Sequence, residues 1–323
     1  MIGMDLERIE AVARILERVS RRLRPYTFDD PALYPSTSDR EVVTSFFLAM
    51  VAIDHRTRGR GRVFEACIGG RRLVGSELLY YLGREALERD PEFFSAERLA
   101  RISADDVRRW LSYGGATIWD PEVRAYLLRD LGTKLLKLFR GEASRIIDES
   151  RGALRGSGTE PGLLDLLRVF RAYEDPVEKK SMLLAKILER RGIAEFRDSH
   201  SKRVAVDNHI ARIGLRLGIV RLGGELWKLV REGREVSVEM DVLIRMCLRE
   251  AWFEVSKRSG IDPFLLDDAL WTFGREVCLW GSPRCFECSH PLCFEGSCPF
   301  KDLCLVRRLG VFNEHTCWST WYY

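Results

Sequence analysis

The sequence contains no long apolar run, little net charge and almost no strand-like pattern. No stretch approaches the roughly 20 apolar residues that a membrane-spanning helix needs, so we expect no membrane segment. A formal net charge of +4 over 323 residues is too small to indicate nucleic-acid binding by itself, and it does not oppose it. Residues 1–19 form an amphipathic pattern with acidic residues, unlike a signal peptide. We therefore expect a cytoplasmic protein.

Hydrophobic residues make up 46% of the chain and charged residues 31%, which is typical of a globular protein. A chain of this length buries a large core and forms one or two domains. The abundance of Arg and Glu fits a thermophilic source.

Helical periodicity runs through the whole chain and predicts an all-α protein. Only the segment 62–74 has the pattern of a small β-hairpin, with two short runs on either side of Gly69 and Gly70. The predicted helices are 4–22, 39–54, 74–89, 104–112, 121–140, 161–172, 176–191, 207–218, 224–232, 238–257 and 262–275.

A loop rich in Gly and Ser, 152–162, is the best candidate for a boundary between two lobes. We expect an N-terminal helical lobe over 1–155 and a second helical lobe over 156–275. A cysteine-rich metal-binding loop and tail would follow over 276–323.

Six of the nine cysteines lie within the 27 residues from Cys278 to Cys304. In a reducing compartment, cysteines this closely spaced indicate metal ligands before disulfides, although hyperthermophilic proteins are an exception. The cluster predicts one soft metal centre near the C-terminus.

A second motif lies about 70 residues earlier, where Asp207 follows an apolar run and begins an amphipathic helix. Val206, Ile210, Ile213 and Leu217 are spaced to form the buried stripe of that helix. Aspartate is a preferred N-cap, which explains its position without any catalytic role. The alternative is a rigidly held carboxylate that stabilises an oxocarbenium-like sugar or activates a nucleophile.

Two segments resemble the helix-hairpin-helix DNA glycosylase superfamily. "VDNHIARIGLRLG" is similar to its catalytic-aspartate segment, and "LWTFGREVC-x6-C-x2-C" is similar to the Fe–S loop of endonuclease III and MutY. The resemblance implies a two-lobed, all-α glycosylase fold with Asp207 as the catalytic carboxylate. It also implies a [4Fe–4S] cluster, for which a structural zinc ion is the alternative.

The sequence departs from that family in two places. No Leu-Pro-Gly-Val-Gly hairpin precedes Asp207, and the cysteine spacing breaks after Cys288. The resemblance implies Cys278, Cys285 and Cys288 as metal ligands. The fourth is Cys304 if the ten residues 289–298 are an insertion, with Cys293 or Cys298 as alternatives.

The nucleophile is expected in the segment 175–192, which has the pattern of a helix capped by Asp175. Lys180 shares an apolar face with Leu184 and Leu188, whereas Lys179 lies on a face that we expect to be solvated. Burial disfavours the ammonium form and makes an amine nucleophilic. Archaeal 8-oxoguanine glycosylases similarly carry a Schiff-base lysine upstream of the aspartate, so Lys180 is the first candidate and Lys179 the second. A lysine whose head reaches water is the alternative to both.

Residues 39–190 resemble another family, the queuosine-salvage N-glycosylases. "GGRRLVGSELLYYLGREAL", "SADDVRRWL", "KKSMLLAKI" and the terminal Trp-Tyr-Tyr carry this resemblance. It implies cleavage of the C1′–N bond of a 7-deazaguanine nucleotide.

Three arginines in a glycine-rich loop, Arg56, Arg58 and Arg60, are candidates for phosphate contacts, and Asp54 and His55 for the substrate pocket. A solvated loop and a satisfied helix end are the ordinary alternatives.

The sequence therefore predicts a monomeric N-glycosylase, a hydrolase that removes a damaged or modified purine-like base from DNA, with or without lyase activity. The alternatives are a nucleotide N-ribosidase of the queuosine type and a non-catalytic nucleic-acid-binding protein with a structural metal centre.

Overall fold

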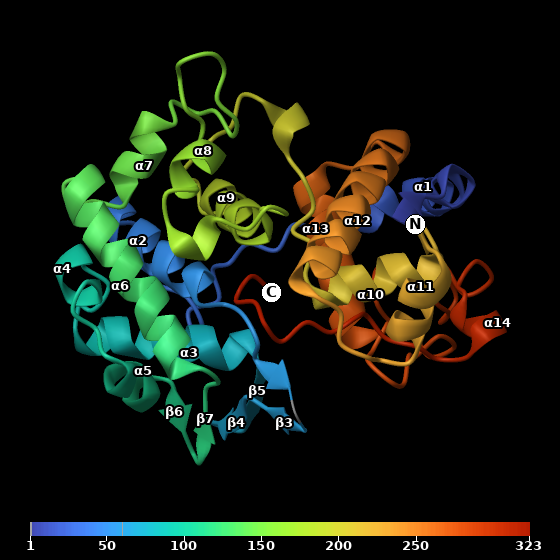
Figure 1. Ribbon diagram of the computed structural model, residues 1–323, viewed down its shortest axis with the longest axis horizontal. Helices are drawn as coiled ribbons and strands as arrows, with labels where there is room; N and C mark the ends of the chain where they lie inside the picture. The colour runs from blue at the N-terminus through green and yellow to red at the C-terminus, as the bar shows by residue number, and fades with distance from the viewer. Residues whose placement is uncertain (1, 60) are drawn as a thin grey trace. The chain divides into compact units, whose positions relative to one another are not determined.

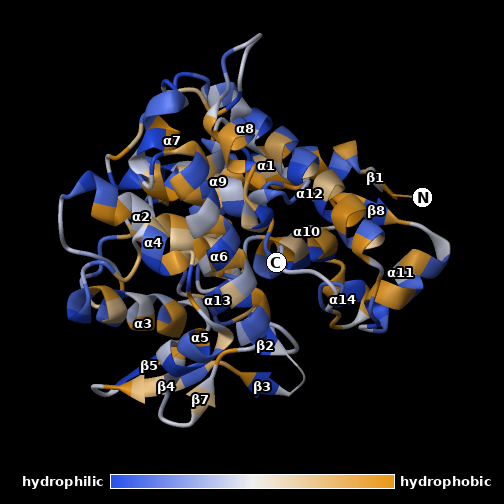
Figure 2. Ribbon diagram, turned by 60° about the vertical axis from the view of Figure 1, so that its left-hand side comes forward, coloured by the Kyte–Doolittle hydropathy of each residue, from blue (hydrophilic) through white to orange (hydrophobic). Residues whose placement is uncertain are grey.

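The computed structural model describes residues 2–59 and 61–323 and is mainly helical (Figure 1). The all-α prediction therefore holds in the main. Within the described residues, the strands form four small antiparallel sheets of two strands each. Most helices carry both hydrophobic and hydrophilic residues, as expected of helices that cover a core (Figure 2).

Every predicted helix appears, most of them shortened by a few residues at one or both ends. The helices are α1 (Leu6–Val19), α2 (Arg40–Ala52), α3 (Ser76–Arg89), α4 (Ala96–Leu99), α5 (Ala104–Trp110), α6 (Pro121–Leu138), α7 (Ser144–Glu149), α8 (Leu163–Leu167), α9 (Lys179–Arg190), α10 (Asn208–Leu217), α11 (Gly224–Arg231), α12 (Val238–Ser259), α13 (Pro263–Glu276) and α14 (Val306–Leu309). Helices α4, α7 and α14, of four to six residues each, were not predicted, because an element this short seldom shows a helical period of its own.

The hairpin predicted over 62–74 is confirmed as β4 (Glu65–Ile68) paired with β5 (Arg71–Val74). Its turn places Gly69 and Gly70 at positive φ, which only glycine adopts without strain. The other pairs are β1 (Ile2–Met4) with β8 (Val220–Leu222), β2 (Arg58–Gly59) with β3 (Arg62–Val63), and β6 (Ser112–Tyr113) with β7 (Ala116–Thr117).

The chain forms two compact units whose boundaries differ from the expected ones. The first unit joins the N-terminal segment through Tyr26 to Lys202–Thr320, and the second comprises Thr27–Ser201 and Trp321–Tyr323. The N-terminal segment belongs to the first unit because β1 pairs with β8 and α1 packs against α12.

The loop 152–162, expected to separate two lobes, lies inside the second unit. The backbone N–H groups of Leu154 and Arg155 donate to the carboxylate of Asp198, at 2.7 and 3.0 Å. These bonds fix the loop to its own unit, so its glycines serve turns and not a domain boundary.

In the first unit, α10 packs against α12 and α13. The four residues of its predicted stripe, Val206, Ile210, Ile213 and Leu217, are all buried, as expected. Gly214 permits the close approach of α12: a Cβ there would lie 2.5 Å from Leu248 and 3.1 Å from the indole nitrogen of Trp252.

In the second unit, α2 is buried along most of its length and packs against α3, α6 and α9. The side chain of Tyr173 donates to the carbonyl of Leu48 within this core, at 2.6 Å. Within the part of the chain that the structure describes, no helix is long and apolar enough to cross a membrane.

Candidate metal centre and candidate catalytic residues

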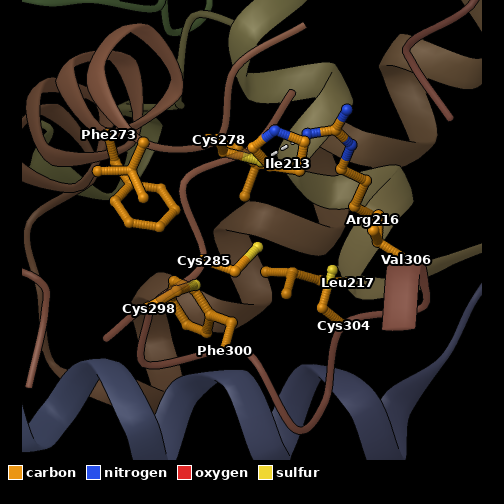
Figure 3. Close-up of a pocket in the computed structure, with 12 residues that line it drawn as sticks. Ile213, Arg216, Leu217, Phe273, Cys278, Cys285, Cys298, Phe300, Cys304 and Val306 are labelled. Carbon is orange, nitrogen blue, oxygen red and sulfur yellow. Dashed lines mark hydrogen bonds between the residues drawn. The ribbon is translucent and has the colours of Figure 1, made fainter. Parts of the chain in front are cut away.

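Four cysteines of the C-terminal segment line one cavity in the first unit (Figure 3). Cys278 follows the end of α13, and Cys285, Cys298 and Cys304 come from the irregular segment after it. The remaining wall is apolar apart from one arginine, and consists of Ile213, Arg216, Leu217, Phe273, Val277, Pro283, Phe300 and Val306.

Cys288, one of the expected ligands, does not line this cavity. It forms a disulfide with Cys293, and Cys298 lines the cavity in its place. The cause is the path of the chain: the backbone N–H of Cys298 donates to the carbonyl of Cys285 at 2.9 Å. This bond closes residues 286–297 into a loop and returns the chain to the cavity at Cys298.

Burial makes these thiols poor acids in the absence of a cation. It raises the pKa of Cys298 to about 12 and that of Cys304 to about 11, and it also raises the pKa of Cys285. Thiolates bind metals, so a bound cation would have to supply the energy that deprotonates these cysteines.

The four cavity cysteines are residues of the type that binds soft metal centres. Over residues 2–59 and 61–323, no three His, Cys, Asp or Glu side chains are arranged to hold one metal ion. Four cysteines nevertheless surround a single cavity. Four cysteine thiolates are the usual ligands of a [4Fe–4S] cluster, and they also serve as ligands of a structural zinc ion.

Asp207 is the N-cap of α10. Its carboxylate accepts the backbone N–H of Ile210 at 2.9 Å, and the side chain is half-buried. The N-cap expectation is therefore confirmed. A carboxylate held by this hydrogen bond is compatible with the catalytic hypothesis.

Helix α10 is joined to the cysteine segment by Arg212. Its guanidinium donates to the carbonyls of Cys278 and Gly274 at 2.8 and 2.9 Å, and it pairs with Glu314 at 3.0 Å. It also lies 2.8 Å from the Nδ1 of His209. Gly274, in the "GREVC" motif, must be small because a Cβ there would lie 2.7 Å from His209.

A third group of buried polar residues lies beside Asp207. Arg245 donates to the carbonyl of Val206 at 3.1 Å and to the side chain of Asn208 at 2.6 Å, and thus holds both neighbours of Asp207. Asp241 accepts from Arg245 at 2.8 Å and lies 2.6 Å from the Nε2 of His315. Desolvation opposes ionisation of Asp241, but the Arg245 charge and the His315 hydrogen bond outweigh it and lower the pKa of Asp241.

The second unit contains Lys180, whose side chain is fully buried, as predicted. Its Nζ donates to the carbonyl of Ala52 at 2.6 Å and lies 3.4 Å from the Nδ1 of His55. Burial, reinforced by the charge of Lys179, holds the pKa of Lys180 well below its ordinary value. Burial therefore favours the neutral amine over the ammonium form.

Two details of this segment differ from expectation. Lys179 is buried instead of solvated, and its Nζ donates to the carbonyl of Asp54 at 3.2 Å. The helix also begins at Lys179, because Asp175 caps the preceding turn through the N–H groups of Val177 and Lys179. Glu178 has a positive φ of 61° and cannot continue a right-handed helix.

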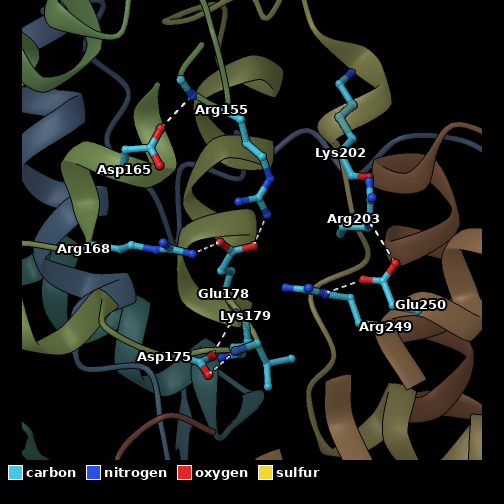
Figure 4. Close-up of polar contacts among 12 residues, drawn as sticks. Arg155, Asp165, Arg168, Asp175, Glu178, Lys179, Lys202, Arg203, Arg249 and Glu250 are labelled. Atoms are coloured by element: carbon cyan, nitrogen blue, oxygen red, sulfur yellow. Dashed lines mark hydrogen bonds and ion pairs between the residues drawn. The ribbon is translucent and has the colours of Figure 1, made fainter. Parts of the chain in front are cut away.

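Glu178 is itself a buried carboxylate that pairs with Arg155 and with Arg168 (Figure 4). Both ion pairs connect the start of α9 to the neighbouring part of the second unit. This arrangement fixes the two lysines that follow Glu178.

The remaining predicted contacts are only partly brought together. His55 is buried near Lys180, whereas Arg56 pairs with Asp120 at 2.9 Å. Arg58 is exposed on β2, and Arg60 lies outside the described residues.

Arg124 is a buried cation that the sequence interpretation missed. Its guanidinium donates to the carbonyls of Trp119 and His55, and burial lowers its pKa to about 9. It stands at the spacing of the buried stripe of α6, with Leu128 and Leu131, and that register could have identified it.

No protein-family model matches this sequence, and no curated protein matches it. Among solved structures, the chain is similar to the 8-oxoguanine DNA glycosylase of Pyrobaculum aerophilum, crystallised with 8-oxoguanosine. The two share 16% identity over 86% of this chain and 91% of that chain, with a TM-score of 0.47. A similarity at this level does not show a shared function.

Proposed function

We propose that this protein is an N-glycosylase that removes a damaged or modified purine-like base from DNA and holds a [4Fe–4S] cluster between Cys278, Cys285, Cys298 and Cys304. The observation that supports the proposal is the position of α10. The helix begins at Asp207, and its arginines contact the segment of the cavity cysteines. The two segments that resemble the glycosylase superfamily therefore pack against each other in the folded chain.

Asp207 supplies a carboxylate to the reaction. Cleavage of the C1′–N bond leaves the electron pair on the base, which takes up a proton, while positive charge develops on the sugar. A fixed negative charge stabilises that sugar cation, and water then adds its oxygen to C1′. Asp207 is half-buried and held at a helix N-terminus, so its carboxylate keeps one orientation.

A lysine that attacks C1′ would add lyase activity. The amine forms the N–C1′ bond as the base departs, and opening of the sugar ring gives an imine. Lys180 has the lowered pKa that this step requires, while Lys179 is slightly more exposed, at 7% against 0%. We assign the role to Lys180 first and to Lys179 second.

The four cavity cysteines would hold the cluster, whose contribution is structural. Metal binding supplies folding energy to a segment with little regular structure of its own. Residues 277–305, which contain only loops and turns, are such a segment.

The test is release of free base from duplexes that carry 8-oxoguanine or other damaged purines. Asp207→Asn is the decisive variant, because Asn is as good an N-cap as Asp but carries no charge. We expect it to fold normally and to lose at least ~100-fold in rate, as the loss of an electrostatic catalyst does. Asp262→Asn, which changes the N-cap of α13 in the same unit, is the matched control.

Borohydride trapping separates the lysines. Lys180→Gln should abolish the covalent adduct and Lys179→Gln should leave it in place; the reverse result would assign the role to Lys179. Unchanged base release by Asp207→Asn would refute the proposed role of Asp207. DNA binding by the wild type without any base release would favour a non-catalytic binding protein.

A second candidate function, hydrolysis of a free 7-deazaguanine nucleotide, is favoured by one observation. The terminal aromatics pack beside the lysine segment: Tyr323 donates to Asp175 at 2.8 Å, and the indole of Trp321 donates to the carbonyl of Arg171 at 3.2 Å. Both segments carry the queuosine-salvage resemblance. Release of base from the nucleotide, with none from DNA, would support this candidate.

A further inference from the structure

We infer that Arg216 is the counter-ion of an anionic metal–thiolate centre and that its charge raises the reduction potential of that centre. The inference deepens the metal site of the proposed function and does not depend on glycosylase activity. Arg216 lies on α10 one turn beyond Arg212 and lines the cysteine cavity (Figure 3).

The guanidinium of Arg216 is buried, with 1% of the residue exposed. It donates to Phe312 O at 2.8 Å, to Leu279 O at 3.0 Å and to Asn313 Oδ1 at 3.1 Å. Its remaining contact is with the Sγ of Cys278, at 3.2 Å. Within the described residues, none of its hydrogen bonds reaches a carboxylate.

The other two arginines buried in this unit are different. Arg212 pairs with Glu314 at 3.0 Å, and Arg245 pairs with Asp241 at 2.8 Å. A buried charge is unfavourable unless an opposite charge accompanies it, so these two pairs are what physical chemistry predicts. Arg216 is the exception, and the sulfur is its only partner that can become an anion.

Metal binding supplies the missing charge. When four cysteines bind as thiolates, their negative charges outweigh the positive charge of a [4Fe–4S] core, so the centre is an anion beside Arg216. The more reduced state is the more negative one. A guanidinium that donates to a ligand sulfur therefore stabilises the reduced state more than the oxidised state.

The experiment uses the full-length protein purified without oxygen, as wild type, Arg216→Gln and Arg216→Lys. Iron and acid-labile sulfide per chain are measured first, and the midpoint potential second. We expect Arg216→Gln to reduce the equilibrium constant for reduction about tenfold, a shift of about 59 mV for one electron. Arg216→Lys keeps the charge and should stay within about threefold of wild type.

Arg307→Gln is the matched control. It removes one positive charge close to Cys304, but Arg307 is exposed and paired with Asp302. Water and salt screen such a charge, so the potential should remain at the wild-type value.

Three results would overturn the inference. The first is a fully loaded Arg216→Gln variant with an unchanged potential, and the second is a centre that contains zinc and no iron. The third is an Arg216→Lys variant that shifts the potential as far as Arg216→Gln does. If Arg216→Gln fails to fold, Arg216→Lys decides: loading with a potential near wild type supports the inference, and failure to load contradicts it. No result depends on base release.

Discussion

Lys180 offers a test of whether a fully buried amine is neutral in the folded protein. Replacing it with Met keeps the length of the side chain and removes the amine. The variant loses the hydrogen bond from Nζ to Ala52 O, 2.6 Å long, which is worth about 1 kcal/mol, or up to about 3 kcal/mol if the carbonyl stays unsatisfied. The lowered pKa acts in the opposite direction. It reduces the free energy of unfolding of the wild type by about 1.4 kcal/mol for each pKa unit, and the Met variant does not carry this cost.

The dependence on pH is the sharper part of this prediction. Between its lowered folded pKa and the ordinary value of 10.5, Lys180 binds a proton in the unfolded chain and not in the folded one. The free energy of unfolding of the wild type therefore rises with pH in that window, by up to about 1.4 kcal/mol per pH unit. Lys180→Met lacks this contribution, so the wild type should gain stability relative to the variant as pH rises.

Urea unfolding at pH 7, 8 and 9, followed by circular dichroism, measures both quantities. Lys137→Met, which changes an exposed lysine near the end of α6, is the matched control and should leave the pH dependence unchanged. If the stabilities of wild type and Lys180→Met run parallel with pH, the buried amine keeps its proton on folding. Lys180 would then lack the neutral form on which its proposed role as a nucleophile rests.

Two further predictions concern buried groups. Asp241→Asn should reduce the free energy of unfolding by about 3–5 kcal/mol in urea, because Arg245 loses that carboxylate in a buried site; a loss below about 1 kcal/mol would contradict this. Burial lowers the pKa of His55, His290 and His315, in His290 to about 4. Below about pH 6.5 these histidines bind protons in the unfolded chain but stay neutral in the folded protein until the pH falls to their lowered pKa. Stability should therefore fall by about 1.4 kcal/mol per pH unit for each histidine, and equal stability at pH 7 and 5 would refute it.

The helices were predictable from the sequence where their apolar period was long enough to read. Helix α10 shows this best, since its stripe, its N-cap Asp207 and its C-terminal Gly218 all follow local rules. The unit boundaries were not predictable in this way. The pairing of β1 with β8 joins residues more than 200 positions apart, and no local sequence feature of either strand identifies its partner.

The same distinction between local pattern and tertiary contacts applies to the two candidate lysines. Burial of Lys180 follows from its position on the apolar face of α9, and the structure confirms it. Burial of Lys179 does not follow from that pattern, because both faces of the first turn are covered by other parts of the unit. A helical period identifies the most buried face, but it does not reveal whether the opposite face is also covered.

The cysteine segment shows why spacing alone does not identify the cysteines that line the cavity. Cys288 fits the spacing of the family motif, but proximity in space is decided by the bond between Cys298 N and Cys285 O. That bond closes a loop whose tip is held by the Cys288–Cys293 disulfide and by a bridge between Phe294 and Ser297. None of residues 286–297 lines the cavity. Because the loop closes at Cys285 and Cys298, it keeps Cys288 and Cys293 away from the cavity lining and returns the chain to the cavity at Cys298. The count of residues between cysteines does not reveal this closure, so it does not by itself identify the cysteines that share the cavity.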